Sequence, residues 1–432
     1  MIAALQTADR ATLLTWTRIL VFVIVVLGTL TPFNAPILVF GGFVLQAFWI
    51  ARDHGDLWQR LRAATISRGW IALAVFFAYL AVRLFELPIA EDALPGLASM
   101  GLIGLFTFAT LALMPHQNED VQSAIALAFI AAFAAASAVH AIELTSGFAL
   151  RRKLWTWVPL LRPRSWKVIL DGDQVRDVVV FIANPTSTAL AALFWPVLLL
   201  YGRVAKSRAQ QGLIAAGVVL CIYAIFRSDQ ATSKMALLAG AVTWAIVTYV
   251  PRSARPLLAA IWIGSNLLVL PLALTAYHNE AYKLPRTFSA QHRVVIWGVT
   301  AEKTLEHPWF GIGTGKTNDY DESTSPDVKS IPGTRIPIAT NRHAHNVFLQ
   351  LWYEDGAVGV LLFVFAGLPV IGWIASAPQR HQALLAAAFS ATVVSASLSY
   401  SLFAAWFLAT FAITALFCRF AVNFEPQWQS QT

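Results

Sequence analysis

The stretch NRHAHNVFLQLWYEDGAVGVLLFVFAGLPVIGWIAS, residues 341–376, decides the fold of this chain. Its second part, residues 356–376, carries no charged side chain. As a helix it is long enough to cross the roughly 30 Å hydrocarbon core of a bilayer. Its first part places two histidines and an asparagine directly before the apolar sequence. The stretch therefore predicts a membrane helix that begins next to titratable side chains.

The composition of the whole chain indicates the same class. Of its 432 residues, 57% are hydrophobic and 12% are charged, and the mean hydropathy is +0.62. Soluble domains are roughly half apolar and about a quarter charged, so we expect an all-α polytopic membrane protein of about 12 helices. The net charge of +8 does not indicate nucleic acid, because the basic residues are scattered among apolar spans. It indicates topology signals and anionic membrane lipids.

The apolar runs predict the individual spans. The first run, residues 19–30, is followed at once by another and lacks a clear cleavage site, so we expect a retained span rather than a signal peptide. The twelve predicted spans are 12–31, 35–51, 70–88, 97–115, 122–146, 186–202, 211–227, 234–250, 256–277, 356–376, 382–399 and 402–422.

Charge in the connections predicts the orientation. An even number of spans puts both ends of the chain on one side, and that side receives the basic connections at 52–68, 203–208 and 252–255 and Arg380. The positive-inside rule makes it cytoplasmic. The largest polar segment, residues 278–345, then lies outside and holds five of the nine histidines. We therefore expect the chemistry on the outer side.

One outer connection breaks the charge rule. Residues 150–170, LRRKLWTWVPLLRPRSWKVIL, hold six basic residues and three tryptophans. Basic residues interleaved with tryptophan are typical of a segment that lies in the headgroup layer and docks an anionic lipid. The alternative is that one span has been miscounted.

The motif HAHN, residues 343–346, first suggests a metal site. A metal needs three or four ligands, and no HExxH, carboxylate cluster or cysteine pair lies nearby, so we expect neither a metal nor a cofactor. His343 fits a solvated loop. His345 stands at the top of a membrane helix, partly shielded from water, where a pKa near about 6.5 suits a general base.

Glycines follow the histidine. Gly356 and Gly359 predict a short helix over 346–353, a break at 354–356 and then a full span, with the glycines allowing close helix packing. The sequence GIGTG, residues 311–315, lacks the strand-then-helix setting of a dinucleotide site. It indicates a turn, with an anion-binding nest as the alternative.

Several cations stand near predicted span ends on the outer side. Cations at helix ends commonly extend to lipid headgroups. If several of them instead converge beside His345, they would form a clamp for a diphosphate, because arginine binds phosphate in a bidentate manner. The candidates are Arg227, Lys234, Arg286, Arg293 and Lys316.

Three motifs resemble one known family. HNVFLQLWYEDGAVG, residues 345–359, consists of His-Asn, nine residues, Gly, two residues and Gly. This resembles the signature of the O-antigen ligase family of bacterial inner-membrane glycosyltransferases. SKMALLAG, 233–240, is similar to the family's Ser-Arg-Gly-type segment, with Lys234 in place of the arginine. HRVVIWGVTAEKTLEHPWFGIGTG, 292–315, is similar to its Arg-x-x-x-Trp…Pro-x-x-Gly-x-Gly stretch. The N-terminal half matches only in hydropathy.

The resemblance implies a reaction. The family transfers a completed glycan from undecaprenyl diphosphate to the lipid A-core oligosaccharide on the periplasmic side, without a metal and with inversion. It implies that His345 is the general base and that the cations Arg286, Arg293, Lys234 and Arg227 bind the diphosphate. Arg342 and Asn346 would orient the substrate or the histidine. Residues 151–167 would face the phosphates of lipid A.

The resemblance also implies an organisation similar to glycosyltransferases of type C, with one large periplasmic loop. Residues 1–277 would hold nine spans and a basic, tryptophan-rich periplasmic connection at about 147–185. Residues 278–355 would form the periplasmic catalytic loop and a short helix. Residues 356–432 would hold three spans and a cytoplasmic C-terminus.

Three alternatives stay open. O-antigen polymerases and protein O-oligosaccharyltransferases share the His-Asn motif, although the latter tend to carry longer C-terminal regions than this chain shows after its last span. A transporter would need ionisable residues deep within spans, and His140 and Arg18 are isolated there.

Overall fold

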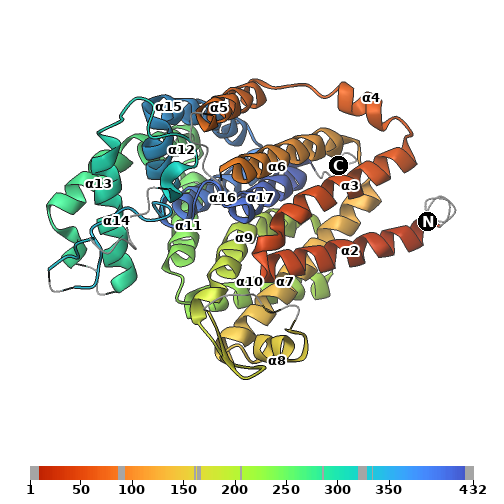
Figure 1. Ribbon diagram of the computed structural model, residues 1–432. Coiled ribbons are helices and arrows are strands. Elements are labelled where there is room, and N and C mark those ends of the chain that lie inside the picture. Colours follow the sequence, from red (N-terminus) through yellow and green to blue (C-terminus); the bar gives the residue numbers. More distant parts are fainter. Residues whose placement is uncertain are drawn as a thin grey trace. The chain divides into compact units, whose positions relative to one another are not determined.

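Figure 1 shows the computed structural model of the chain, which describes residues 9–85, 93–159, 162, 167–204, 207–284, 287–319, 328–332 and 334–423. Within these ranges the regular structure is helical apart from one hairpin and an isolated bridge. The hairpin pairs β1 (Val168–Asp171) with β2 (Gln174–Val178) in antiparallel register. The predicted all-α class is therefore confirmed.

Ten helices of the described residues are long and apolar enough to cross a membrane. A helix satisfies its own backbone hydrogen bonds, which a segment in hydrocarbon must do. The ten helices confirm a polytopic membrane protein. They are α2 (Arg10–Leu30), α3 (Ala35–Asp53), α6 (Ala93–Leu113), α7 (Glu119–Thr145), α9 (Asn184–Val204), α10 (Arg208–Arg227), α11 (Ala231–Tyr249), α15 (Val347–Ala375), α16 (Gln379–Leu398) and α17 (Ala405–Asn423).

Two predicted spans differ from the expectation. The span at 70–88 forms α5 (Arg68–Leu84), which has 17 residues, and its last predicted residues lie outside the described part of the chain. The span at 256–277 forms two helices, α12 (Ala254–Leu267) and α13 (Val269–His278), bent by 56°. Pro271 explains the bend, because its ring has no N–H for the carbonyl of Leu267 and clashes with it. The pair counts as an eleventh span only if the bent helices cross together.

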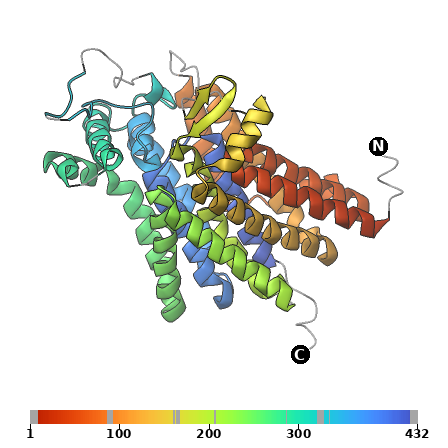
Figure 2. The ribbon, with the colours of Figure 1, turned by 90° about the horizontal axis from the view of Figure 1, so that it is seen from below.

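The helices form two compact units. The first contains Met1–Ala64, Leu105–Val242 and Ala409–Thr432, and α7 packs there against α2 and α10 (Figures 1 and 2). Small side chains let α10 approach α7 closely. A Cβ added to Gly217 of α10 would come within 2.9 Å of the Cβ of Ala134 of α7. Phe129 of α7 stacks on Phe417 with ring centroids 3.7 Å apart.

The second unit contains Thr65–Gly104 and Thr243–Leu408 and is built around α15. The helices α5, α12, α16 and α14 (Phe288–Thr304) all pack against it. Gly356 interrupts α15 with φ 63° and ψ −166°, a backbone conformation that no helix contains. The predicted order of a short helix, a break and a full span is therefore confirmed.

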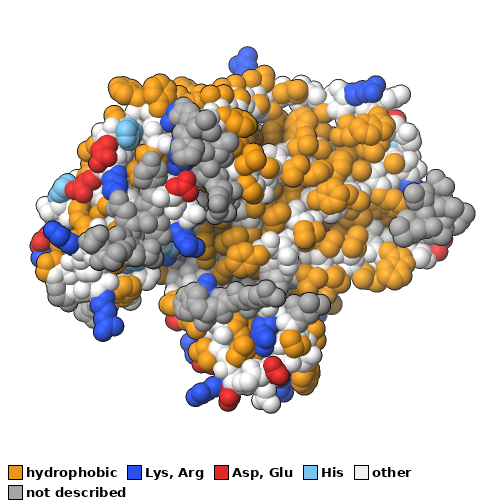
Figure 3. All heavy atoms as spheres, viewed as in Figure 1, with side chains coloured by type: hydrophobic (Ala, Val, Ile, Leu, Met, Phe, Trp, Pro, Cys, Tyr) orange, Lys and Arg blue, Asp and Glu red, His pale blue; other side chains and the backbone are white. Residues whose placement is uncertain are grey.

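Large apolar side chains remain exposed along the spanning helices. Ile19, Val23 and Leu27 form such a row on α2, at 45%, 43% and 54% exposure. Figure 3 shows hydrophobic side chains over wide parts of the visible face. Apolar rows of this extent fit a lipid solvent, because they would be unfavourable in water.

Candidate functional site

The site begins where α15 begins. The side-chain oxygen of Asn346 accepts hydrogen bonds from the backbone N–H groups of Phe348 at 3.0 Å and Leu349 at 3.1 Å, which makes Asn346 the N-cap of the helix. Asn346 is itself buried. It therefore fixes the helix start directly after His345. A role of Asn346 toward a substrate stays a prediction.

His345 is held in one orientation. Its Nδ1 atom lies 2.9 Å from the carbonyl oxygen of Ser399. Because a carbonyl oxygen only accepts hydrogen bonds, Nδ1 must carry the proton, and in the neutral ring Nε2 keeps its lone pair. That tautomer is the one a general base needs.

The backbone of His345 is strained. Its φ of 54° lies in the left-handed region, which costs a non-glycine residue on the order of 1–3 kcal/mol. Trp297 of α14 helps to hold this conformation, because its Nε1–H donates to the carbonyl oxygen of Ala344 at 2.9 Å. Ala344 is buried between the two histidines. Residues 341–346, which we call the histidine loop, are thus anchored to α14 on one side and to Ser399 on the other.

The two histidines of the loop are neighbours in space. The ring centroids of His343 and His345 lie 4.1 Å apart with the planes tilted by 57°. Two imidazoles fall short of the three or four ligands that a protein metal site usually has. Within the described ranges, no group of three or more His, Cys, Asp or Glu side chains is arranged to hold a metal ion.

Burial keeps His345 neutral. It lowers the pKa of the ring from 6.5 to about 3, and the positive charges of His343, Arg293 and His292 act in the same direction. The hydrogen bond to Ser399 acts against them. The ring therefore stays unprotonated, and able to accept a proton, at neutral pH.

Arg293 and Tyr400 complete the surroundings of His345. Burial lowers the pKa of Arg293, and the nearby phenol of Tyr400 opposes that change. Burial raises the pKa of Tyr400, and Arg293 opposes it in turn. The ring of Tyr400 packs edge-on against Trp406 with centroids 4.6 Å apart. A base, a guanidinium and a phenol thus share one half-buried region.

Ser399, Tyr400 and His292 were missing from the sequence predictions. Ser399 contributes only its backbone carbonyl, and a carbonyl leaves no mark in a sequence. Tyr400 lies in SLSYSLF, residues 397–403, a polar interruption between two apolar spans, which was the one available signal. His292 adjoins Arg293, and its Nε2 is buried without a hydrogen-bond partner among the described residues.

The predicted cations lie in different parts of the chain's structure. Arg293 lies close enough to His345 to influence its pKa, and Arg342 is exposed in the same loop. Arg286 lies outside the described residues. Arg227, at the exposed end of α10, and Lys234, half-buried in the first turn of α11, belong to the first unit. A convergence of these cations on His345 stays a prediction.

The GIGTG sequence packs against the break in α15. We call residues 308–317 the glycine loop. Its amides at Ile312 and Gly313 donate to the carbonyls of Tyr353 at 3.0 Å and Glu354 at 2.8 Å. On the other side of the break, the amide of Ala357 donates to the carbonyl of Pro308 at 2.9 Å. The loop thereby pairs backbone groups that the break leaves outside the helical ladder.

The glycine loop also binds two buried carboxylates of α15. Glu354 accepts from the amide of Gly315 at 3.0 Å and from the hydroxyl of Thr317 at 2.5 Å. The hydroxyl of Thr314 donates to Asp355. The predicted turn is therefore confirmed, and its amide and hydroxyl groups hold a carboxyl group that the chain itself supplies.

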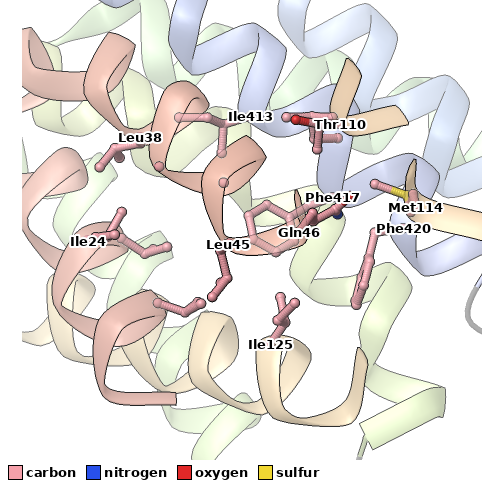
Figure 4. Close-up of a pocket in the computed structure, with 15 residues that line it drawn as sticks. Ile24, Leu38, Leu45, Gln46, Thr110, Met114, Ile125, Ile413, Phe417 and Phe420 are labelled. Atoms are coloured by element: carbon pink, nitrogen blue, oxygen red, sulfur yellow. The ribbon is translucent and has the colours of Figure 1, made fainter. Parts of the chain in front are cut away.

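A cavity of about 100 Å³ lies in the first unit, whereas His343 and His345 belong to the second unit. Figure 4 shows its lining, in which Ile24, Leu38, Leu45 and Phe420 surround the space and Gln46 and Thr110 are the polar members. No titratable side chain lines it. Its surface fits hydrocarbon and offers no group for acid–base chemistry.

Comparison with known proteins shows which family part of the chain matches. Residues 216–364 match the family described as O-antigen ligase, and they include all three motifs that carry the resemblance. The resemblance is therefore confirmed. The chain is 23% identical over 198 residues to a protein of Rickettsia conorii, and 25% identical over 199 residues to one of Rickettsia bellii. Both are provisionally named polysaccharide ligases. Each match covers 44% of this chain and 47% of the relative, so the chain spans about half the length of these curated relatives.

Proposed function

We propose that this chain, which matches the O-antigen ligase family over residues 216–364, is a glycosyltransferase of the bacterial inner membrane. It transfers O-antigen polysaccharide from undecaprenyl diphosphate to the lipid A-core oligosaccharide on the periplasmic side. The single observation that supports this most is the hydrogen bond of His345 to Ser399, which leaves a neutral Nε2 beside Arg293.

The chemistry follows from the two substrates. Nucleotide sugars are absent outside the cytoplasm, so the donor must arrive as a lipid-linked diphosphate, which leaves readily once its charge is neutralised. The acceptor hydroxyl is a poor nucleophile and needs a base. His345 Nε2 removes the hydroxyl proton while the oxygen attacks the anomeric carbon from the opposite face. The bond from that carbon to the diphosphate breaks, the configuration inverts, and the proton remains on the imidazole.

Arg293 is the cation best suited to the leaving group. It is half-buried and makes no ion pair with a carboxylate among the residues that the structure describes. A partly desolvated guanidinium without a counter-charge favours an anionic ligand. It binds phosphate oxygens in a bidentate manner and stabilises the charge that develops as the diphosphate leaves.

The remaining predicted residues take supporting roles. Arg286, Lys234 and Arg227 add positive charge around the diphosphate, and Arg342 and Asn346 orient the acceptor or the histidine loop. Residues 278–355 form the periplasmic catalytic loop between spans on either side, in an arrangement similar to type C glycosyltransferases. Residues 151–167 face the phosphates of lipid A. No metal or cofactor takes part in this scheme.

The test uses a strain that lacks its own O-antigen ligase. Wild type should restore laddered lipopolysaccharide, and His345→Ala should give no ladders while lipid-linked glycan accumulates. His307→Ala is the matched control, because His307 is an exposed histidine of the same predicted loop, and it should restore ladders. Unchanged ladders with His345→Ala would remove His345 as the base.

The nature of the product separates this proposal from its relatives. Longer lipid-linked glycans without attachment to lipid A-core would indicate a polymerase, and glycosylated protein would indicate an O-oligosaccharyltransferase. In a purified assay, transfer should persist when a chelator is present. Loss of transfer under chelation, restored by a divalent cation, would contradict the metal-free scheme.

A further inference from the structure

A short amphipathic helix follows the end of α7. This helix, α8 (Ala149–Trp157), begins after a turn in which Gly147 (φ 60°) and Phe148 (φ 61°) both have left-handed backbone. The turn redirects the chain, and α8 begins four residues after the candidate span ends at Thr145. A helix that starts so soon after a span lies near the end of that span, at the level of the lipid headgroups.

Two faces of α8 are fixed to the rest of the first unit. Arg151 forms an ion pair with Glu143 of α7 at 3.2 Å, and its backbone amide donates to the same carboxylate at 3.0 Å. Trp155 is buried in a small core with Val175 and Val178 of β2. The hydroxyl of Thr156 accepts from the amide of Val175 at 3.0 Å. The helix and the hairpin are therefore one packed module.

The third face of α8 is apolar and uncovered. Leu150, Leu154 and Trp157 are 47%, 45% and 76% exposed, and their spacing of four and three residues puts them on one side of the helix. Ile169 and Leu170 of β1 are exposed as well. Because the buried face of α8 already packs against α7 and the hairpin, this second apolar face is not needed for the core of the module.

Cations lie beside and behind the uncovered face, since the helical spacing puts Lys153 next to Leu150 and Leu154 and Arg152 on the opposite side of α8, toward the hairpin. Lys153 lies within the same helical turns, Arg152 reaches the backbone carbonyl of Arg176 at 3.3 Å, and Arg176 itself is exposed on β2. None of the three forms an ion pair with another described residue. The exposed acids Asp171 and Asp173 lie at the turn of the hairpin. Figure 3 shows basic, acidic and hydrophobic side chains mixed over the α8 region, at the bottom of the view.

We propose that α8 and the β1–β2 hairpin form a docking surface for the anionic headgroups of membrane lipids. Leu150, Leu154 and Trp157 insert below the phosphates, with the indole at the interface that tryptophan favours. Arg152, Lys153 and Arg176 contact the phosphate oxygens, where each cation near an anionic surface adds to the attraction. The inference depends on the membrane-spanning fold, and it extends to the bilayer lipids the contact with lipid A phosphates that is proposed above for residues 151–167. The tests below measure membrane insertion and not glycan transfer, so they can fail separately from the proposed function.

Depth measurement with spin labels tests the insertion. The two native cysteines, Cys221 and Cys418, are both buried, so a single introduced cysteine can be labelled in the full chain. The variants are Leu154→Cys, Trp157→Cys and, as the control at the hairpin turn, Asp173→Cys. In bilayers of phosphatidylcholine with phosphatidylglycerol, labels at 154 and 157 should collide with oxygen and be protected from a water-soluble nickel complex. The label at 173 should show the reverse. Equal access of nickel to all three labels would overturn the proposal.

Removal of charge tests the headgroup contact. The Trp157→Cys label should be better protected from nickel in the anionic bilayer than in pure phosphatidylcholine. Arg152→Gln/Lys153→Gln should abolish that difference between the two bilayers. The matched control, Arg252→Gln/Arg255→Gln, removes two exposed cations from another connection and should preserve it. A difference that survives in the Arg152→Gln/Lys153→Gln variant would reject the recognition of anionic headgroups. An identical result in both bilayers for the parent label would reject it as well.

Discussion

The Nδ1 atom of His345 lies 2.9 Å from the carbonyl oxygen of Ser399, which is 54 residues further along the chain. The contact joins the start of α15 to the connection between α16 and α17. It determines which ring nitrogen carries the proton, and so which nitrogen can accept one. The left-handed backbone of His345 shows that this orientation is held against a conformational cost. The relationship leads to predictions about pH, about the neighbouring phenol and about the break in α15.

The first prediction concerns the acid side of the pH–rate profile. A base whose pKa is lowered from 6.5 to about 3 stays active as the pH falls through 6.5. The acid limb of kcat/KM, which reports the free enzyme, should therefore lie well below pH 6.5. A bound diphosphate brings negative charge that favours the imidazolium, so the limb of kcat should lie at higher pH than that of kcat/KM. Initial rates with lipid-linked donor across a pH series measure both, and a kcat/KM limb at or above pH 6.5 would contradict the prediction.

The second prediction uses the neighbour of the base. After burial, the charge of His343 is the largest influence that lowers the pKa of His345. His343→Gln removes that charge, so the pKa of His345 should rise and the acid limb of kcat/KM should move to higher pH. The shift should be partial, because burial is the larger cause. His307→Gln, at an exposed position, should leave the limb in place. A limb that stays in place or moves to lower pH in His343→Gln would count against the pairing of the two rings.

The third prediction concerns Tyr400. Its phenol lies close enough to Arg293 to alter the pKa of the guanidinium, and we expect both groups to contact the diphosphate. Tyr400→Phe removes one hydrogen bond to a charged ligand, worth about 1.5–3 kcal/mol, and should lower kcat/KM by roughly 10- to 100-fold. Tyr249→Phe, which alters a tyrosine that is 85% exposed, is the control and should have no effect. An unchanged kcat/KM in Tyr400→Phe would exclude its hydroxyl from the site.

The sequence predicted the parts of this fold that depend on composition and local spacing. Apolar length located the spans, and two glycines located the break in α15, because a left-handed backbone at Gly356 needs a residue without a Cβ. His345 was singled out because it stands directly before an apolar run, and the structure places it at the start of α15, whereas its role as a base stays a prediction. Each of these signals lies within a few residues of the feature that it indicates.

The missed features depend on contacts that sequence spacing does not report. Ser399 acts through a backbone carbonyl, which every residue possesses, so nothing in its identity marks it. The bend between α12 and α13 was missed because hydropathy remains high through Pro271. The β1–β2 hairpin was missed because residues 150–170 were interpreted by charge and tryptophan content. The buried positions of β2, Val175 and Val178, are three residues apart, so they do not show the alternation that indicates a strand.

The fourth prediction tests the break in α15. Gly356 has φ 63°, and a Cβ there would collide with the carbonyl carbon of Trp309 in the glycine loop. Gly356→Ala should therefore lower the free energy of unfolding by about 1–3 kcal/mol or more, since it combines backbone strain with a clash. Gly372→Ala is the matched control, because Gly372 lies in the same helix with no atom within 4 Å of an added Cβ. Thermal unfolding in detergent should show a lower Tm for Gly356→Ala alone, and equal Tm values would show that the break is not required.

The fifth prediction concerns Glu354, which joins the glycine loop to α15. Glu354→Ala leaves the amide of Gly315 and the hydroxyl of Thr317 without their acceptor in a buried place, at about 1–3 kcal/mol for each unsatisfied group. Glu354→Gln keeps one oxygen and should be the milder change, so we expect the Tm to fall in the order wild type, Glu354→Gln, Glu354→Ala. The glycine loop also packs against Gly356, so transfer activity should fall in the same order. If Glu354→Gln proved as unstable as Glu354→Ala, the carboxylate charge rather than its acceptor geometry would hold the loop. If both variants matched wild type in Tm, the glycine loop would not depend on this contact at all.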